Sequence, residues 1–422
     1  MTAGFQRTGA ILCADGVPLS HIAQACGTPC YVYSAEQLEL NIYRLKKAFA
    51  DHLPAADQPL IAYACKANSN LAVLSCVARQ GLGADVVSGG ELLRARESGI
   101  DAARIVYSGV GKSDEDIKEA IRQNVAQINI ESEPEFHRIA DIAKDIGITA
   151  RIAFRLNPDV DAKTHAKITT GKEENKFGLP AQGIMRLYKE ATNTPFIEAQ
   201  GISVHIGSQL TSLEPFEEAF KKTAAFIHDL RAQSLIVKSI DLGGGLGIVY
   251  QEEQAPCLDH YARLVRDIIH PLATRIIIEP GRLLVGDAGL LLTKILYIKE
   301  TESRSYMILD GGMNDLVRPA MYDAWHAITS VVETGQPEKS YDIVGPICET
   351  GDTFAKDRMM PEMAAGDLVA VMTAGAYGFV MASRYNTRPL PPEIMTRGGH
   401  FRVVRQKENI QAIIKEDIIP DW

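Results

Sequence analysis

Eight short runs of β-branched and apolar residues alternate with amphipathic helical stretches over the first two thirds of the chain. This alternation predicts a parallel sheet, because parallel neighbours need a crossover helix between them. Eight such units favour a closed (β/α)8 barrel over an open, doubly wound sheet. Function is then expected at the carboxyl ends of the strands. The predicted strands are residues 60–66, 84–88, 105–108, 127–131, 150–157, 201–208, 239–243 and 275–279.

Beyond residue 282 the pattern changes, because apolar runs follow one another with little helix between them. This texture predicts a second, mainly β domain. Runs at 10–13 and 31–33 are too strand-like to open the barrel and are expected to add strands to that domain. We therefore predict N-terminal strands of the β-domain in residues 1–35, the barrel in 36–282, and the rest of the β-domain in 283–422. The marking runs are 290–298, 305–309, 341–344, 368–372 and 401–405.

Composition narrows the function classes. The 422 residues are 46% hydrophobic and 23% charged, with a formal net charge of −9, which disfavours nonspecific binding to nucleic acid or anionic membranes. No apolar run approaches the roughly 18 residues of a membrane span, and the N-terminus lacks the form of a signal peptide, so a cytoplasmic protein is expected. Seven scattered cysteines predict neither a disulfide framework nor a zinc site. Small-molecule chemistry, without a metal, is the expectation.

Lys66 follows an apolar run at the point where the first barrel strand is expected to end. Seating an amine beside a buried run favours its neutral, nucleophilic form, which builds Schiff bases with aldehydes. Pyridoxal phosphate is the first aldehyde to consider. The plainer alternative is a solvated lysine or an ion-pair partner.

Two further strand ends carry anion-binding chemistry. Three consecutive glycines, residues 243–245, follow the seventh strand, where the loop of such a barrel recurrently binds phosphate. A flexible turn is the alternative. Glu279 ends the eighth strand and is followed by Pro280, Gly281 and Arg282. A buried carboxylate needs a partner, and the protonated ring nitrogen of pyridoxal phosphate can supply one. An internal Glu–Arg salt bridge explains the same segment.

Other candidates are weaker when taken singly. His205 and Ser208 lie in the segment that ends the sixth strand, where the imidazole could stack on a flat ring and the hydroxyl could bond phosphate, although a buried core histidine is common. Asp85 ends the second strand and is ambiguous. Residues 109–113 resemble the tail of a P-loop, but Val106 stands where its first glycine should be, so nucleotide binding is not expected there.

The predicted β-domain holds three polar clusters that a plain β-fold does not require. Arg318 and Tyr322 can address a carboxylate, and Cys348 sets a thiol beside the carboxylate of Glu349. Tyr377 lies among small residues and could contact phosphate. Solvated loops are the alternative explanation for all three.

Together these segments resemble the diaminopimelate decarboxylase family, a barrel-type group of pyridoxal-phosphate enzymes. The resemblance covers nearly the whole chain in the expected order, and the loop 164–178 also resembles the active-site loop of that family. Thr350 and Met321 replace a more usual Ser and Leu, and neither carries chemistry. The matching segments are 63–68, 205–209, 243–245, 279–282, 318–322, 348–352 and 375–377.

The resemblance implies a role for each candidate. Lys66 would hold pyridoxal 5'-phosphate covalently, Glu279 would pair with its ring nitrogen, and His205 would stack on its ring. Asp85 is also expected to bind the cofactor. Further residues are expected to surround the phosphate of the cofactor. Those residues are Ser208, Gly244, Gly281, Arg282 and Tyr377.

The resemblance further implies a set of residues that bind the substrate: Arg282, Arg318, Tyr322, Glu349 and Tyr377. It also implies a homodimer in which Cys348 of the second subunit is the proton donor. The expected reaction converts meso-diaminopimelate to L-lysine and CO2. Decarboxylases of ornithine, arginine or carboxynorspermidine remain alternatives, although their substrates do not all present a second amino-acid end. A racemase or a noncatalytic pyridoxal-phosphate-binding protein would need no thiol–carboxylate pair.

Overall fold

The computed structural model describes residues 2–160 and 176–422. The chain divides into two compact units. The barrel unit comprises Asn41–Val249 and Glu253–Leu283, and the β unit comprises Met1–Leu40, Tyr250–Glu252 and Leu284–Trp422. The boundaries near residues 35 and 282 stay predictions of where independently folding domains begin and end.

The predicted barrel is confirmed. Eight parallel strands close in the order β10-β11-β12-β5-β6-β7-β8-β9, so β5 follows β12 and completes the ring. Their buried apolar side chains explain why these short runs become strands, as at Ile276, Ile277 and Ile278. The strands are β5 Leu60–Ala64, β6 Gly83–Val86, β7 Ile105–Tyr107, β8 Gln127–Ile130, β9 Ala150–Leu156, β10 Ile197–Val204, β11 Ser239–Asp241 and β12 Arg275–Ile278.

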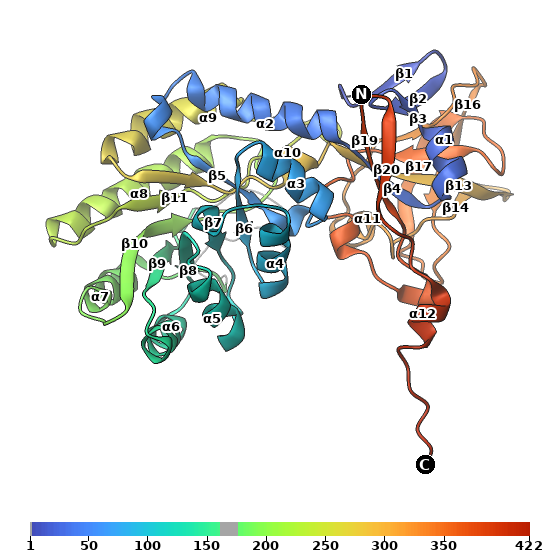
Figure 1. Ribbon diagram of the computed structural model, residues 1–422. Coiled ribbons are helices and arrows are strands. Elements are labelled where there is room, and N and C mark those ends of the chain that lie inside the picture. The colour runs from blue at the N-terminus through green and yellow to red at the C-terminus, as the bar shows by residue number, and fades with distance from the viewer. Residues whose placement is uncertain (1, 161–175) are drawn as a thin grey trace. The chain divides into compact units, whose positions relative to one another are not determined.

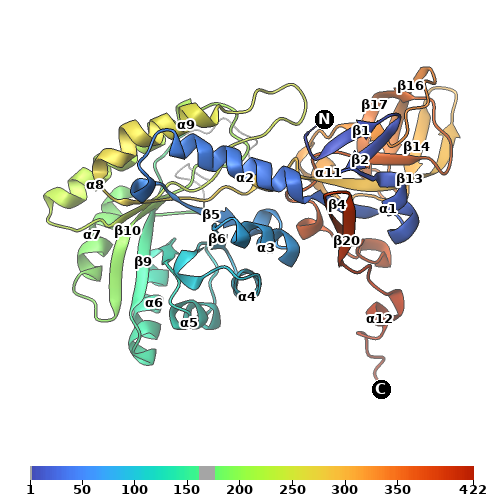
Figure 2. The ribbon, with the colours of Figure 1, turned by 45° about the horizontal axis from the view of Figure 1, so that its top comes forward.

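Helices surround the barrel strands as an outer layer (Figures 1 and 2). Their termini follow local sequence signals: Ser113 and Asp116 form a capping box at the start of α5, and Gly147 ends α6 in the left-handed region at φ 67°. The helices are α2 Ala35–Ala50, α3 Leu71–Arg79, α4 Gly89–Glu97, α5 Asp114–Arg122, α6 Glu133–Ile146, α7 Ala181–Ala191, α8 Glu214–Ala232, α9 Leu258–Leu264 and α10 Arg282–Val285.

Two predicted barrel segments need correction. The first strand ends at Ala64, and Lys66 lies in a 3-10 turn, Cys65–Ala67, rather than on the strand. The sixth strand runs from Ile197 to Val204, several residues earlier than predicted, so His205 and Ser208 lie in the loop beyond it. In both places the chain leaves the strand before the polar candidate, so Lys66 and His205 lie in the connections at the carboxyl end of the barrel.

The β unit is built on a mixed sheet with the path β17-β16-β14-β13-β4-β19-β20, to which β18 and β15 add through β13. Six of its strands match predicted runs, whereas β15, β17 and β19 were missed. The strands are β4 Cys30–Ser34, β13 Gly289–Glu300, β14 Ser305–Leu309, β15 Ile328–Ser330, β16 Glu338–Val344, β17 Thr353–Pro361, β18 Leu368–Val371, β19 Glu393–Arg397 and β20 His400–Arg405.

The predicted contribution of N-terminal strands to this sheet is confirmed for β4, which pairs antiparallel with β13 and parallel with β19. The run at 10–13 instead enters a separate three-stranded sheet of β1 Phe5–Thr8, β2 Ile11–Ala14 and β3 Val17–Pro18. Its buried side chains share one apolar core with β4 and β13. The helices of this unit are α1 Leu19–Cys26, α11 Arg318–Tyr322 and α12 Ile410–Ile414.

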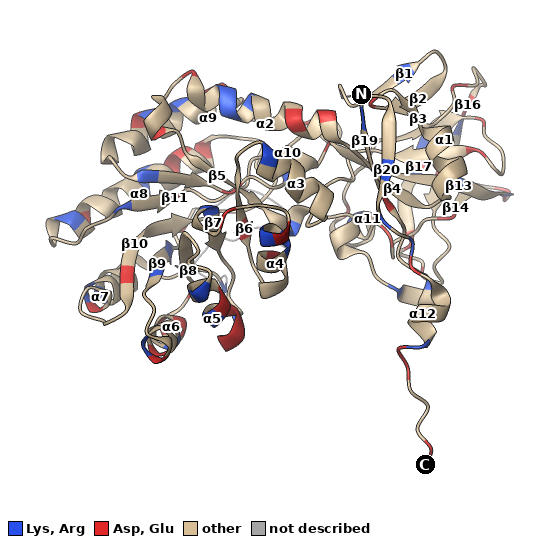
Figure 3. Cartoon of the chain, viewed as in Figure 1, with Lys and Arg blue, Asp and Glu red and all other residues tan. Residues whose placement is uncertain are grey.

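Charged side chains gather on the outer helices of the barrel, most visibly on α5 and α6 (Figure 3). The first turn of α5 alone carries Asp114, Glu115 and Asp116. Among the described residues, every helix is too short or too polar to cross a membrane. The loop 164–178 lies mostly outside the described residues.

Candidate active site

Lys66 lies beside Asp85 at the carboxyl ends of two neighbouring barrel strands. Its Nζ is 3.0 Å from Oδ2 of Asp85, which is fully buried on β6, whereas 35% of the Lys66 side chain is exposed. The amine is therefore held by a buried carboxylate and remains accessible at the barrel mouth. The other carboxylate oxygen of Asp85, Oδ1, is buried and has no hydrogen-bond partner in the described part of the chain.

Glu279 follows β12 and is 7% exposed. Its Oε1 accepts a hydrogen bond from the hydroxyl of Ser108 at 3.3 Å. Burial raises the pKa of Glu279 well above its usual range, and the neighbouring carboxylates of Asp241 and Asp85 raise it further, against the opposing charge of Lys66. Such a carboxyl needs a hydrogen-bonding cation before it can stay ionised.

His205 lies just beyond β10 and is neutral. Its Nδ1 accepts the backbone N–H of Gly244 at 3.1 Å. Burial, with the nearby positive charges of Arg155 and Lys66, holds the pKa of His205 well below its usual range. A neutral imidazole can face an electron-poor ring without adding a positive charge.

The phosphate candidates fall into two groups in the barrel unit. Ser208 Oγ accepts a hydrogen bond from Nη2 of Arg282 at 3.2 Å, so the hydroxyl and the guanidinium are brought together. Gly244 is instead committed to packing, because a Cβ there would lie 2.2 Å from the carbonyl oxygen of Glu279. Gly281 is similarly close to Ala64 and Ala67, with 3.1 Å and 3.0 Å to their Cβ atoms. Glycine at these two positions therefore allows the ends of neighbouring strands to pack closely.

In the β unit, Arg318 is held in a fixed orientation. It is 6% exposed, its Nη1 is 2.9 Å from Nε2 of His326, and its guanidinium lies 4.6 Å from the ring centroid of Tyr250. His326 Nδ1 is 2.8 Å from the carbonyl oxygen of Met372, which requires Nδ1 to carry the proton and leaves Nε2 to accept from Arg318. Tyr322 lies at the other end of the same short helix, α11.

Cys348 and Glu349 occupy an exposed turn after β16 of the β unit. The hydroxyl of Tyr385 donates to Oε1 of Glu349 at 2.5 Å, and the backbone N–H of Cys348 donates to Oδ1 of Asn386 at 3.3 Å. Asp352, which is 3% exposed, accepts the N–H groups of Ile347 and Met313 and fixes the base of the turn.

Tyr377 lies in a loop of small residues in the β unit with a left-handed φ of 55°. This conformation is unusual for a side chain of its size and costs free energy that the surrounding contacts must offset. The neighbouring Gly375 has no room for a Cβ, which would lie 2.0 Å from the carbonyl oxygen of Val285. The loop conformation is therefore set by close packing.

Several residues of these networks were missed from the sequence. Asp241, Ser108 and Asn129 point into the barrel, and His326, Tyr250 and Tyr385 orient the β-unit candidates. Ser108 had a usable signal, because it is the polar residue that ends a predicted buried strand, whereas Asn129 and Asp241 lie inside predicted strands. Tyr250 and Tyr385 had none, since each lies remote in sequence from its partner, and His326 lies in a loop eight residues from Arg318 with no motif to mark it.

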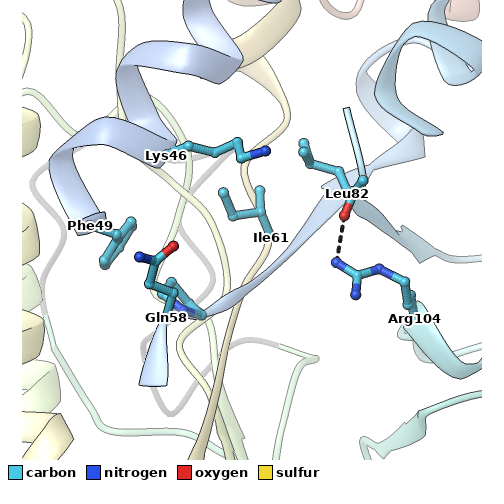
Figure 4. Close-up of a pocket in the computed structure, with 8 residues that line it drawn as sticks. Lys46, Phe49, Gln58, Ile61, Leu82 and Arg104 are labelled. Carbon is cyan, nitrogen blue, oxygen red and sulfur yellow. Dashed lines mark hydrogen bonds between the residues drawn. The ribbon is translucent and has the colours of Figure 1, made fainter. Parts of the chain in front are cut away.

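A separate hollow of about 200 Å³ lies at the amino-terminal ends of the barrel strands (Figure 4). Lys46 and Arg104 line it, but the amine donates to the carbonyl oxygen of Gln80 at 3.0 Å and the guanidinium to that of Gly81 at 2.5 Å. Its lining residues are Lys46, Phe49, Gln58, Pro59, Ile61, Gly81, Leu82 and Arg104.

The carboxyl-end residues fit pyridoxal phosphate. An accessible amine suits its aldehyde, the buried Glu279 and the unpartnered Oδ1 of Asp85 suit a cationic group, and the Ser208–Arg282 pair suits its phosphate. Within the described residues, no three His, Cys, Asp or Glu side chains gather as metal ligands.

Comparison with known proteins gives the family. Residues 39–286 match the model of the pyridoxal binding domain of pyridoxal-dependent decarboxylases. The chain is 42% identical to the diaminopimelate decarboxylase of Zymomonas mobilis and 45% identical to that of Pseudomonas fluorescens, in each case over 99% of both chains. This chain belongs to the diaminopimelate decarboxylase family.

Solved structures agree. The diaminopimelate decarboxylase of Helicobacter pylori complexed with L-lysine has a TM-score of 0.90 at 40% identity, covering 94% of this chain and 98% of that one. The enzyme from M. jannaschii in complex with L-lysine has a TM-score of 0.95 at 37% identity, covering 100% and 99%. The family predicted from the sequence is thus confirmed, and with it pyridoxal phosphate as the cofactor.

We predict that reduction with borohydride will fix the mass of the cofactor on the peptide that contains Lys66, because this is the accessible amine among the buried carboxyls. Lys66→Ala should abolish the label and the visible absorbance of the purified protein. Lys46→Ala, at the opposite end of the barrel, is the matched control and should keep both. Peptide mass spectrometry checks the result, and label on any other lysine contradicts the assignment.

Proposed function

We propose that this chain decarboxylates meso-2,6-diaminopimelate to L-lysine and CO2, the last step of lysine biosynthesis, with pyridoxal 5'-phosphate as cofactor. The observation that carries the proposal is the cluster of Lys66, Asp85 and Glu279 at one end of a closed barrel, in a chain that matches diaminopimelate decarboxylases over its whole length. The bound cofactor supplies an electron-accepting ring that stabilises the negative charge left on the substrate carbon when CO2 departs.

The barrel residues would bind and orient this cofactor. Lys66 would anchor it through its amine, and Glu279 would pair with the ring nitrogen. His205 is neutral and can cover the ring, while Ser208 and Arg282 present a hydroxyl and a guanidinium to the phosphate. Gly244 and Gly281 would bring the backbone close to that phosphate, and Asp85 would orient Lys66.

The β-unit residues would recognise the end of the substrate that does not react. Arg318 is rigidly held and can bind a carboxylate through two N–H groups, with Tyr322 on the same helix. Glu349 can accept the distal ammonium, and Arg282 and Tyr377 complete the substrate set. A site with partners for both charges favours a substrate with a second amino-acid end over ornithine or arginine.

A panel of substrates tests the proposed reaction. Purified protein should release CO2 from meso-diaminopimelate and form L-lysine, with little or no CO2 from lysine, ornithine or arginine. Release from ornithine or arginine at a comparable rate would make the chain a decarboxylase of another basic amino acid. Interconversion of stereoisomers without CO2 would make it a racemase.

The substrate role of Arg318 predicts a specific loss. Arg318→Ala should raise the free energy of the transition state for diaminopimelate by about 2–4 kcal/mol and so lower kcat/KM, because a substrate carboxylate is left poorly paired. Visible absorbance of the cofactor should survive. Arg304→Ala is the control, since Arg304 is an exposed arginine of the same unit that pairs with Asp342, and it should change kcat/KM little. Loss of cofactor from the Arg318 variant would contradict the substrate role.

We further propose a homodimer whose two active sites are shared, with Cys348 of one subunit serving the site built on Lys66 of the other. The family resemblance supports this arrangement, and so does the exposure of the Cys348 thiol in the β unit. In this account the thiol, or the amine of Lys66, returns a proton to the substrate carbon after CO2 leaves.

Subunit exchange tests the shared site. Lys66→Ala and Cys348→Ala homodimers should each be nearly inactive, whereas a randomly exchanged equal mixture should recover about a quarter of wild-type activity, because two-fold pairing places both lesions in one site of the heterodimer. Native mass spectrometry confirms exchange. Confirmed exchange without recovered activity would place the whole site within one chain.

A further inference from the structure

A chain of buried polar side chains crosses the barrel interior and ends on Glu279. The hydroxyl of Ser239 donates to Gln127 at 2.8 Å, and Gln127 donates to Asn129 at 2.7 Å. Asn129 donates to Ser108 at 3.1 Å, and Ser108 donates to Glu279 at 3.3 Å. All five residues are at least 90% buried, at positions where apolar side chains would be expected.

The hydrogen-bond directions in this chain are fixed. Because the carbonyl oxygen of the Asn129 side chain accepts from Gln127, its amide nitrogen must donate, and it donates to both Ser108 Oγ and Asp241 Oδ2. Ser108 Oγ is thereby an acceptor, which leaves its hydroxyl proton for Glu279. Within residues 2–160 and 176–422, the side chain of Glu279 receives one O–H bond, from Ser108, and no N–H bond.

Asp241 receives more support than Glu279 does. Its Oδ1 accepts the backbone N–H of Gly243 at 3.0 Å, and its Oδ2 accepts the amide of Asn129 at 3.0 Å. Hydrogen bonds from N–H groups favour the ionised form of a carboxyl. The two carboxyls also act on each other's pKa, with the charge of Asp241 raising that of Glu279, so one proton between them relieves their repulsion.

The surrounding charges agree with a proton on Glu279. The titratable groups that face the pair are Lys66 in the turn after β5, Asp85 on β6 and Tyr261 on α9. Burial and the two aspartates raise the pKa of Glu279 well above its usual range. Burial also raises the pKa of Asp241, but the bonds from Glu279, Asn129 and Gly243 oppose that rise.

We propose that Asp241 is a positioning residue that keeps Glu279 in its acid form until the cofactor binds, so that Glu279 itself protonates the ring nitrogen. The O–H bond of Glu279 breaks, an N–H bond forms on the ring, and the resulting carboxylate is the partner of that N–H. The inference rests on the proposed function, because the ring is that of pyridoxal phosphate. The proton on the ring nitrogen therefore comes from the binding site and not from solvent.

Difference infrared spectroscopy tests the proton on Glu279 without measuring activity. The measurement is made well above pH 7, where Glu91, whose pKa burial raises to about 7, is ionised. Cofactor-free wild-type protein with carbon-13 in its glutamate carboxyls should then show the C=O stretch of one protonated glutamic acid, and addition of pyridoxal phosphate should replace it with a carboxylate band. Glu279→Gln should lack the band. Asp116→Asn, a capping aspartate at α5, should keep it. Absence of the band, or its persistence after the cofactor binds, overturns the proposal.

Calorimetry in two buffers of different ionisation enthalpy tests the role of Asp241. The measurement is made above the pKa of the free cofactor's ring nitrogen. An amide at position 241 can donate to Glu279 and leave it ionised, so Asp241→Asn should take up about one more proton from solvent on binding than wild type. Asp116→Asn should match wild type. Equal proton uptake in the Asp241 variant and wild type overturns the proposal.

The two ways of failing can be told apart. If pyridoxal phosphate does not bind or does not label Lys66, the proposed function fails. If it binds and labels Lys66 but the glutamic acid band is absent, only the role of Asp241 and Glu279 fails. Should Asp241→Asn not fold, Asn129→Ala takes its place: it removes the N–H bond that favours ionised Asp241, so the glutamic acid band should weaken, and an unchanged band overturns the role of Asp241.

Discussion

Three carboxyl groups and one amine are confined to the mouth of the barrel, and this crowding of charge governs the rest of the site. Asp85, Asp241 and Glu279 are each at least 90% buried, and the charge of Lys66 opposes the rise that burial and the two aspartates cause in the pKa of Glu279. Burying three carboxylates beside one amine is costly unless a proton or another cation is shared among them. A cofactor with a basic ring nitrogen relieves that cost, so its binding is coupled to the charge of the site.

The closed parallel barrel is what brings these groups together. Asp85 and Asp241 lie on β6 and β11, and Lys66 and Glu279 lie just past β5 and β12. Register carries all four to one end, because every strand runs in the same direction. The glycines after β11 make the arrangement possible, since a Cβ at Gly244 would collide with the carbonyl oxygen of Glu279. Close packing of this loop is thus what allows the buried charged groups to lie near one another.

Much of this could be predicted from the sequence because strand ends carry a local signal. The eight barrel strands, the β-domain strands around β13 and the family were all predictable from apolar runs and short polar motifs. Lys66 was placed on a strand although it lies in a 3-10 turn, because a single 3-10 turn leaves no periodicity to detect. Asp241 and Asn129 were missed because their importance comes from facing each other across the barrel, 112 residues apart in sequence. Tyr250 was missed for the same reason, since only the fold brings it to Arg318.

The central claim is that Glu279 of the cofactor-bound enzyme is a carboxylate paired with a protonated ring nitrogen. Nitrogen-15 NMR of the enzyme loaded with cofactor labelled at the ring nitrogen measures this directly. The account predicts a protonated-ring chemical shift in wild type that moves to the neutral value in Glu279→Gln, with Lys46→Ala unchanged as a control. A neutral ring nitrogen in wild type, or a protonated one that is indifferent to Glu279, would contradict it.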